Sequence, residues 1–232
     1  FYSPGARITI CSDGRVFSDL IYVSDEDVTT YSQGLSKMLD EIGANAINLF
    51  NLEDVFGELS FDEMRRQLVV NHANPLENLH DLVKNDLNHR SLFNGIHRFL
   101  IEDHLFLQAF KSRNKLRAEC KELAYGVIQR SNAWSALVGK QFPHALRLSI
   151  HPQPYHSDKI GIHLLKSPDV WGTPWHNVAV HDGKQFLLMK RSEAENMGAS
   201  LVWNDRGPSH FVLSDTSQLL ATGNRVMSPP SP

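Results

Sequence analysis

Basic and histidine side chains recur in the stretch 147–180 at a spacing that suits acid–base chemistry. Read with the period of two of a β-strand, Arg147 and His151 share one face, and Lys159 and His163 continue such a face after a proline-rich turn. Imidazoles and a tuned amine exchange protons near neutral pH, so this face could supply catalytic acids and bases. Because the alternate positions are apolar, we predict an antiparallel hairpin with its apolar row in the core. A hairpin whose polar face is only solvated is the alternative.

An HxD motif in the same stretch offers a second kind of chemistry. His156 and Asp158, with the distant His210, match the 2-His-1-carboxylate site of Fe(II)/2-oxoglutarate oxygenases. The match is weak, because the chain has 12 histidines and the residues before the motif have a helical pattern instead of the strands of a jelly roll. We keep this oxygenase as a distant alternative. The histidines here fit no standard zinc spacing, and the sequence has no Walker loop, GxGxxG or GxSxG motif.

Composition and charge limit the classes of protein. The chain has 232 residues, 41% hydrophobic and 21% charged, so it can bury the core of a globular domain. Its 23 basic and 26 acidic residues give a net charge of −3, which provides no overall field to recruit nucleic acid or an anionic membrane. Only two cysteines are present, and we find neither an apolar run long enough to span a membrane nor a secretory signal. We expect a cytoplasmic protein.

The first part of the chain has the pattern of a β–α–β unit. Residues 7–11 alternate as a short strand, and the SDGR sequence at 12–15 contains an Asp-Gly turn signal. A capping box at Ser24 begins a helix that ends at Gly43, and residues 46–51 form a second strand beside the first. Because α/β proteins often bind ligands where a strand ends in a small polar loop, the SDGR turn is a candidate site.

Residues 60–139 have the periodicity of helices. Ser60 begins a second capping box, Pro75 fits the first turn of the next helix, and residues 114–139 read as one long amphipathic helix. We interpret polar side chains on these helices, such as Arg130, as solvated faces. The helical block is then mainly scaffold.

The last part of the chain returns to short strands. Residues 177–190 hold two apolar runs around Gly183, which is typical of a hairpin. Residues 199–204 and 209–214 read as further strands, and residues 192–197 as a short helix. The fold class is therefore α/β, with a central helical block and a C-terminal set of short strands.

Four segments carry a family resemblance: YSPGARITICSDGRVFSDLIYVSDEDVTTY (2–31), RLSIHPQ (147–153), KIGIHLL (159–165) and TPWHNVAV (173–180). Together they resemble the isocyanide (isonitrile) synthase family of the PvcA type, which is related to the formyl-tyrosine synthases of the yeast spore wall. The resemblance implies one Rossmann-like α/β catalytic domain over 1–226, followed by a proline-rich tail at 227–232. Family members have a longer N-terminal region with a substrate loop, so we expect this domain to lack an N-terminal segment of the family.

The resemblance also implies an activity. The α-amine of an L-amino acid would become an isonitrile, with ribulose 5-phosphate as the carbon donor and no metal or other cofactor, in secondary metabolism. A formyl-amino-acid product is the near alternative, and a domain that only binds is a third interpretation. A fused or separate oxygenase or peptide synthetase would act downstream.

Proton transfer at the ketone would fall to the catalytic set Lys159, His151 and His176. Trp175 and Tyr155 would line the side-chain pocket. Three of these residues have a structural alternative: Lys159 as a solvated lysine at a strand edge, His176 as a buried histidine bonded to a backbone carbonyl, and Trp175 as core.

Substrate binding requires charged partners. Arg147 and Arg15 would hold a phosphate or carboxylate, because a guanidinium binds such groups with two parallel hydrogen bonds. Asp13 or Asp19 would bind the substrate ammonium. The alternative for Arg15 and Asp19 is a local salt bridge that steadies the turn.

Overall fold

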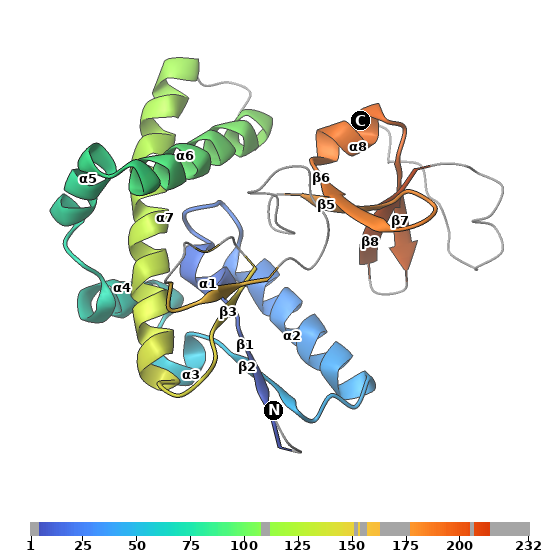
Figure 1. Ribbon diagram of the computed structural model, residues 1–232, viewed down its shortest axis with the longest axis horizontal. Coiled ribbons are helices and arrows are strands. Elements are labelled where there is room, and N and C mark those ends of the chain that lie inside the picture. The colour runs from blue at the N-terminus through green and yellow to red at the C-terminus, as the bar shows by residue number, and fades with distance from the viewer. Residues whose placement is uncertain are drawn as a thin grey trace. The chain divides into compact units, whose positions relative to one another are not determined.

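The structure is a computed structural model that describes residues 5–107, 112–150, 153, 157–162, 177–204 and 207–213. The chain divides into two compact units, residues 1–143 and 144–232. Each unit contains both helices and strands (Figure 1), so the predicted α/β class is confirmed. The described strands form one four-stranded and two two-stranded sheets.

The first unit opens with the predicted β–α–β arrangement. Strands β1 (Ile8–Cys11) and β2 (Ile47–Phe50) are parallel neighbours, and the chain between them forms α1 (Gly14–Phe17) and α2 (Asp25–Glu41). Ile8 pairs with Ile47, and Cys11 with Phe50. The two strands therefore end at the same edge of the sheet, and α1 starts directly beyond that edge.

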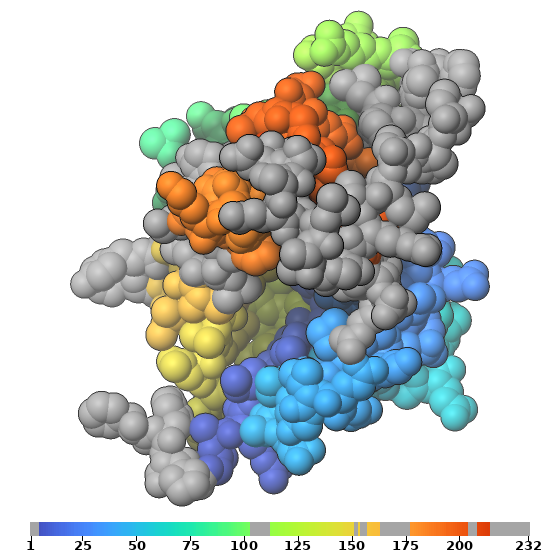
Figure 2. Space-filling model, turned by 90° about the vertical axis from the view of Figure 1, so that its right-hand side faces the viewer, coloured from blue at the N-terminus to red at the C-terminus, as the bar shows by residue number. Residues whose placement is uncertain are grey.

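Helix α2 begins and ends as its sequence predicts. The Ser24 hydroxyl accepts a hydrogen bond from the backbone N–H of Asp27 at 3.0 Å. After the helix, Gly43 has a φ of +64°, a conformation that costs glycine little. The helix lies at the surface of the unit, in the blue of Figure 2, with exposed Tyr31 and Met38 on its outer side.

A block of helices completes the first unit and confirms the predicted helical region. Its members are α3 (Glu53–Phe56), α4 (Phe61–His72), α5 (Leu76–Asn85), α6 (Leu87–Leu107) and α7 (Arg113–Gln141). The Ser60 hydroxyl caps α4 by accepting from the N–H of Glu63 at 3.3 Å. Pro75 is the residue before α5, one position earlier than predicted.

Two apolar clusters hold this unit together. One lies among α5, α6 and α7. The other joins the sheet to α1, α4 and α7 through Val16, Leu52, Met64, Leu68, Ala133, Trp134 and Leu137. The side chain of Phe50 stacks on Trp134, with 5.7 Å between ring centroids. Burial of this second cluster fixes α4 and α7 beside the end of β1.

The second unit begins with a correction. Strands β3 (Leu148–Ser149) and β4 (Ile160–Gly161) pair in parallel, so the predicted antiparallel hairpin is wrong. Alternation of side chains is the same in both strand directions and cannot distinguish them. The connection at 150–159 contains two prolines and is longer than a tight hairpin loop of about two to five residues.

The face of this strand pair also differs from the prediction. Leu148 and Ile160 are 56% and 51% exposed, whereas the Arg147 side chain is only 16% exposed. Among the described residues of this strand pair, the side chain of Arg147 is thus more buried than the apolar side chains of Leu148 and Ile160.

The rest of the second unit follows the predicted order. Its four-stranded sheet has the strand order β6-β5-β8-β7 and consists of β5 (Val178–His181), β6 (Phe186–Met189), β7 (Ser200–Asn204) and β8 (Gly207–Val212). Strands β5 and β6 form the predicted antiparallel hairpin, with Gly183 at a φ of +93°. Helix α8 (Arg191–Asn196) packs on one face of the sheet through Ala194. The tail at 227–232 lies outside the described residues.

No helix in the described part of the chain is long and apolar enough to cross a membrane.

Gly126 in the middle of α7 provides a test of the helix packing. A Cβ at this position would meet only the Leu20 methyl groups, at 3.5 Å, which is ordinary contact. We expect Gly126→Ala to raise the free energy of unfolding by about 0.5–1 kcal/mol, because alanine loses less backbone entropy in a helix. Urea unfolding measures the change. Gly43→Ala is the matched control and should destabilise the protein, since its φ is positive. Equal effects of the two substitutions would contradict this packing.

Candidate functional site

The candidate site of the first unit is the turn that follows β1. Ser12 extends the ladder by donating its N–H to the Phe50 carbonyl at 2.9 Å, and Asp13 then leads into α1. Gly14 lies close to α2, since a Cβ there would come within 3.3 Å of Val28. The predicted SDGR turn is therefore the start of a short helix at the carboxyl edge of the parallel strands, where α/β proteins bind ligands.

Arg15 is buried and surrounded by protein acceptors. Its Nε donates to Glu53 at 3.0 Å, Nη1 to the Asp25 carbonyl at 2.6 Å, and Nη2 to the Thr29 hydroxyl at 2.8 Å. The guanidinium also lies 3.7 Å from the centre of the Phe61 ring. Arg15 thus joins the turn to α2, α3 and α4, and its predicted role as an anion holder stays a prediction.

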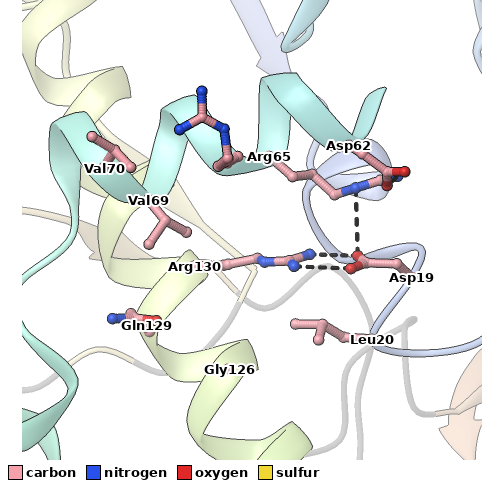
Figure 3. A pocket seen from close by; sticks show the side chains of 10 residues that line it. Asp19, Leu20, Asp62, Arg65, Val69, Val70, Gly126, Gln129 and Arg130 are labelled. Atoms are coloured by element: carbon pink, nitrogen blue, oxygen red, sulfur yellow. Dashed lines mark hydrogen bonds and ion pairs between the residues drawn. The ribbon is translucent and has the colours of Figure 1, made fainter. Parts of the chain in front are cut away.

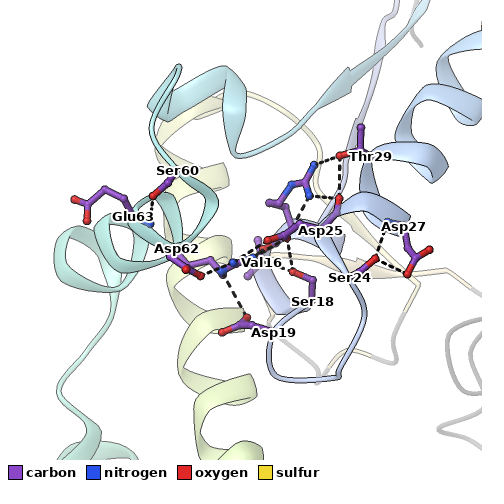
Figure 4. Close-up of polar contacts among 12 residues, drawn as sticks. Val16, Ser18, Asp19, Ser24, Asp25, Asp27, Thr29, Ser60, Asp62 and Glu63 are labelled. Carbon is purple, nitrogen blue, oxygen red and sulfur yellow. Dashed lines mark hydrogen bonds and ion pairs between the residues drawn. The ribbon is translucent and has the colours of Figure 1, made fainter.

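Asp25, the first residue of α2, is the centre of this network (Figure 4). Both of its oxygens accept from the buried Arg65 of α4, at 2.9 and 3.1 Å, and Oδ1 also accepts from Arg15 and from the Ser18 hydroxyl. These hydrogen bonds, the one from Arg65 first, lower the pKa of Asp25 to about 2. The carboxylate therefore stays ionised at every pH at which the protein would work.

Asp19 pairs with a residue of α7, the last helix of the helical block. Both of its oxygens accept from the Arg130 guanidinium of α7, Oδ2 at 2.8 Å, and Arg65 Nε lies 3.7 Å from Oδ1. The predicted local salt bridge between Arg15 and Asp19 is thus wrong, because each has other partners. The prediction that Arg130 is simply solvated is also wrong, since its side chain is 17% exposed and ion-paired.

Asp13 differs from these acids. Its side chain is half-buried, does not cap α1, and forms no ion pair with any described residue. Burial raises the pKa of Asp13 above its usual value of 3.8. Of the acids near the turn, Asp13 is the one that the described arginines leave without a countercharge.

In the second unit, the structure describes two of the predicted basic residues. Arg147 Nη1 donates to Asp158 at 2.6 Å. Lys159 follows directly and is half-buried; its burial, and secondarily the charge of Arg147, lowers the pKa of its amine from 10.5. The Ser157 hydroxyl accepts the backbone N–H of Lys159 at 3.2 Å and so fixes the turn before β4. This strand pair thus presents one paired guanidinium and one amine that burial makes easier to deprotonate.

The remaining predicted site residues, His151, His176, Trp175 and Tyr155, lie outside the described residues. So does His156 of the oxygenase alternative. The two other residues of the proposed iron site have partners of their own. Asp158 pairs with Arg147, and His210 of β8 contacts Ser209 and Phe186. No group of three potential metal ligands occurs in the part of the chain that the structure describes.

Comparison with known proteins decides the family. The model of the family described as pyoverdine/dityrosine biosynthesis protein matches residues 1–202. The chain belongs to this family. The resemblance seen in the sequence is thereby confirmed.

Individual members of the pyoverdine/dityrosine biosynthesis family agree over most of the chain. An L-tryptophan isonitrile synthase, AmbI2 of Fischerella ambigua, is 58% identical over 92% of this chain and 65% of its own length. An L-tyrosine isonitrile synthase of Pseudomonas aeruginosa is 46% identical over 92% of this chain and 66% of its own length. The crystal structure of the PvcA protein from Pseudomonas aeruginosa matches with a TM-score of 0.83 and 46% identity, over 92% of this chain and 70% of that one. The chain spans about two thirds of the length of these relatives.

Sequence reasoning missed two arginines that shape the site in this family member. Arg65 follows Met64 and precedes Leu68 by three positions, so it lies on the buried face of α4. Arg130 lies three residues after Val127 and four before Trp134, on the apolar face of α7. A charged residue at such a position usually has a buried partner, and this signal was present in the sequence.

The depressed pKa of Asp25 predicts acid sensitivity. A carboxylate whose pKa is lower in the folded than in the unfolded state stabilises the fold above the unfolded value, 3.8, and loses this contribution as pH falls towards 2. We expect Asp25→Asn to destabilise the protein at pH 6 by on the order of 2 kcal/mol and to weaken the pH dependence of unfolding between pH 4 and 2. Urea titrations across this range measure both effects. An unchanged pH dependence in the variant would contradict the assignment.

Proposed function

We propose that the whole protein converts the α-amine of an L-amino acid into an isonitrile, with C2 of ribulose 5-phosphate as the source of the new carbon. The observation that carries the proposal is the 58% identity to an L-tryptophan isonitrile synthase over 92% of this chain. The second relative, named for L-tyrosine, supports an amino acid as the substrate. The proposal includes a Rossmann-like sheet built on the β1–α2–β2 unit, a cytoplasmic location and a downstream oxygenase or peptide synthetase.

The first chemical step sets the requirements for the site. The neutral amine attacks the ketone carbon, and a carbon–nitrogen bond forms while the carbonyl oxygen takes up a proton. Loss of water then gives an imine, before the carbon–carbon bonds at C2 break. The site must therefore bind an ammonium, accept its proton and donate a proton to the ketone oxygen.

Asp13 suits the ammonium better than Asp19 does. Both oxygens of Asp19 are bound by Arg130, so a substrate cation would have to compete with a bidentate ion pair. Asp13 has no such partner among the described residues, and burial raises the pKa of its carboxyl group, which favours a cation beside it. An ammonium beside it would supply the missing positive charge. A carboxylate with a raised pKa is also well suited to accept a proton.

Lys159 suits the proton donor. Its lowered pKa makes the amine a stronger acid than an ordinary lysine, and Arg147 beside it carries a fixed positive charge for a phosphate or carboxylate. His151 and His176 remain the predicted partners of Lys159 in proton transfer, and Trp175 and Tyr155 the predicted walls of the side-chain pocket.

Incubation of the full-length protein with ribulose 5-phosphate labelled with ¹³C at C2 and a panel of L-amino acids tests the reaction. Mass spectrometry should show a labelled product that has gained one carbon and lost two hydrogens. A product that has gained CO would indicate the formyl alternative, and succinate release dependent on Fe(II) and 2-oxoglutarate would indicate the oxygenase. Absence of any labelled product with all amino acids would contradict the proposal.

Asp13→Asn tests the ammonium partner. We expect KM for the amino acid to rise about 30- to 100-fold, because a desolvated ion pair loses one partner, while KM for ribulose 5-phosphate changes little. Asp40→Asn, at an exposed position near the end of α2, is the matched control and should leave both constants unchanged. Equal KM values for Asp13→Asn and the native protein would exclude this role.

Lys159→Arg tests the proton donor, because arginine keeps the charge but does not release a proton at working pH. We expect kcat to fall about 100-fold or more, with little change in KM. In the native protein, kcat should decline on the alkaline side at a pH below 10.5, as the protonated amine is lost. That decline should disappear in the variant. A variant with native kcat would show that Lys159 serves only as a positive charge.

A further inference from the structure

Helix α1 is too short to hold its own shape. A four-residue helix forms too few hydrogen bonds of its own to offset the entropy cost of its first turn. Two carbonyls at its end are satisfied from distant helices instead. Arg130 of α7 donates to the Val16 carbonyl at 3.0 Å, and Arg65 of α4 approaches the Arg15 carbonyl at 3.4 Å. The last turn of α1 is thus capped by side chains from α4 and α7.

Arg130 also binds Asp19, which lies in the loop just after α1. The guanidinium that donates to Val16 binds both oxygens of Asp19, so it fixes the end of the helix and the loop beyond it together. At the other end of α1, the Val16 N–H donates to the Asp13 carbonyl at 2.9 Å. Asp13 and Asp19 are therefore the two ends of one short segment, and Arg130 anchors that segment to α7.

The guanidinium of Arg130 lies at an open groove rather than in the core. The groove has a volume of about 370 Å³ and runs between α4 and α7 (Figure 3). Its lining includes Asp19, Leu20, Gly126, Gln129 and Arg130, and Arg65 and Arg66 contribute from α4. If the Arg130 head group were removed, the space that it leaves would connect to this groove and hence to solvent.

We propose that Arg130 is a positioning residue for the reaction: it holds residues 13–19 so that Asp13 can receive the substrate ammonium, and a free guanidinium ion entering through the groove can replace its head group. This inference rests on the proposed function for the role of Asp13. The anchoring of the turn by Arg130 can be tested without it.

Arg130 is a better subject for this test than Arg65. The Arg65 side chain is 5% exposed and binds both oxygens of Asp25, so its loss would open a buried part of the network that joins α1, α2 and α4 and disrupt the fold. The loss of Arg130 leaves Asp19, which is 36% exposed and can be hydrated.

Arg130→Ala should raise KM for the amino acid about tenfold or more, with a smaller change in kcat. Guanidinium chloride at about 20 mM, far below the molar concentrations that unfold proteins, should restore most of the lost affinity. Equal concentrations of sodium chloride or urea should not, because neither carries a planar cation with paired donors. Arg130→Lys should lie between the alanine variant and the native protein.

Arg66→Ala is the matched control. Arg66 lines the same groove and is 61% exposed, but it pairs with Glu63 within α4 and forms no hydrogen bond or ion pair with the described residues of the turn. We expect native KM values and no response to guanidinium. A similar loss in Arg66→Ala would show that the groove as a whole, and not the anchor at Val16 and Asp19, controls the affinity.

Titration of the Asp13 carboxyl group by ¹³C NMR separates this inference from the proposed function. The native protein should titrate above 3.8, Arg130→Ala should shift towards 3.8 as the turn opens to water, and guanidinium should reverse the shift. If the native protein makes no isonitrile but the titration behaves in this way, the proposed function fails and the anchor stands. If Arg130→Ala leaves both the titration and KM unchanged, or if guanidinium restores neither, the inference is overturned.

Discussion

The carboxylate of Asp25 is the interaction on which the first unit depends. Two buried guanidiniums share it, Arg15 from α1 and Arg65 from α4, and its own position at the start of α2 brings a third element to the same point. Burying two cations is costly, and the cost is met only where each finds ionised and hydrogen-bonded partners. Such a cluster admits few arrangements of the three helices. The cluster therefore fixes the position of the end of β1. Apolar packing alone would not fix it, because apolar surfaces tolerate small shifts of one helix along another.

This constraint also separates two kinds of acid within one short segment. Asp19 and Asp25 are bound by arginines, whereas Asp13 has no cationic partner among the described residues. The segment that carries Asp19 and Asp25 also carries Asp13. In the proposed function, structural and chemical roles are thus divided between neighbouring residues: the acids bound by arginines hold the turn, and Asp13 binds the substrate ammonium.

Local signals in the sequence were enough for most of the elements. Caps at Ser24 and Ser60, the helical period of α7 and the hairpin around Gly183 all depend on residues close in the chain, and all are found. The direction of β4 relative to β3 depends on the path between them, which alternation does not encode. For the candidate site, the sequence predicted the turn after β1, which the structure places at the carboxyl edge of the parallel strands, whereas the roles of the basic residues around Lys159 stay a prediction.

Partners of the site residues were harder to predict than the residues themselves. Arg130 and Asp19 are far apart in the sequence, and no residue near Arg130 in the chain indicates which carboxylate its guanidinium binds. The position of Arg130 on an apolar face was a usable signal, but it could not name the partner. Ion pairs of this kind are decided by the packing of whole helices, and their assignment follows the fold.

The long reach of Arg130 bears on the order in which the molecule assembles. Contacts between segments so distant in the chain form late, because closing the loop between them costs conformational entropy before the contacts can stabilise the fold. The segment after β1 is made early during synthesis, yet it has no stable shape until α7 has emerged and docked. An intermediate with only the N-terminal part folded would thus contain the β–α–β unit without a finished turn after β1, so the proposed binding of an amino acid at this turn should become possible only late in folding.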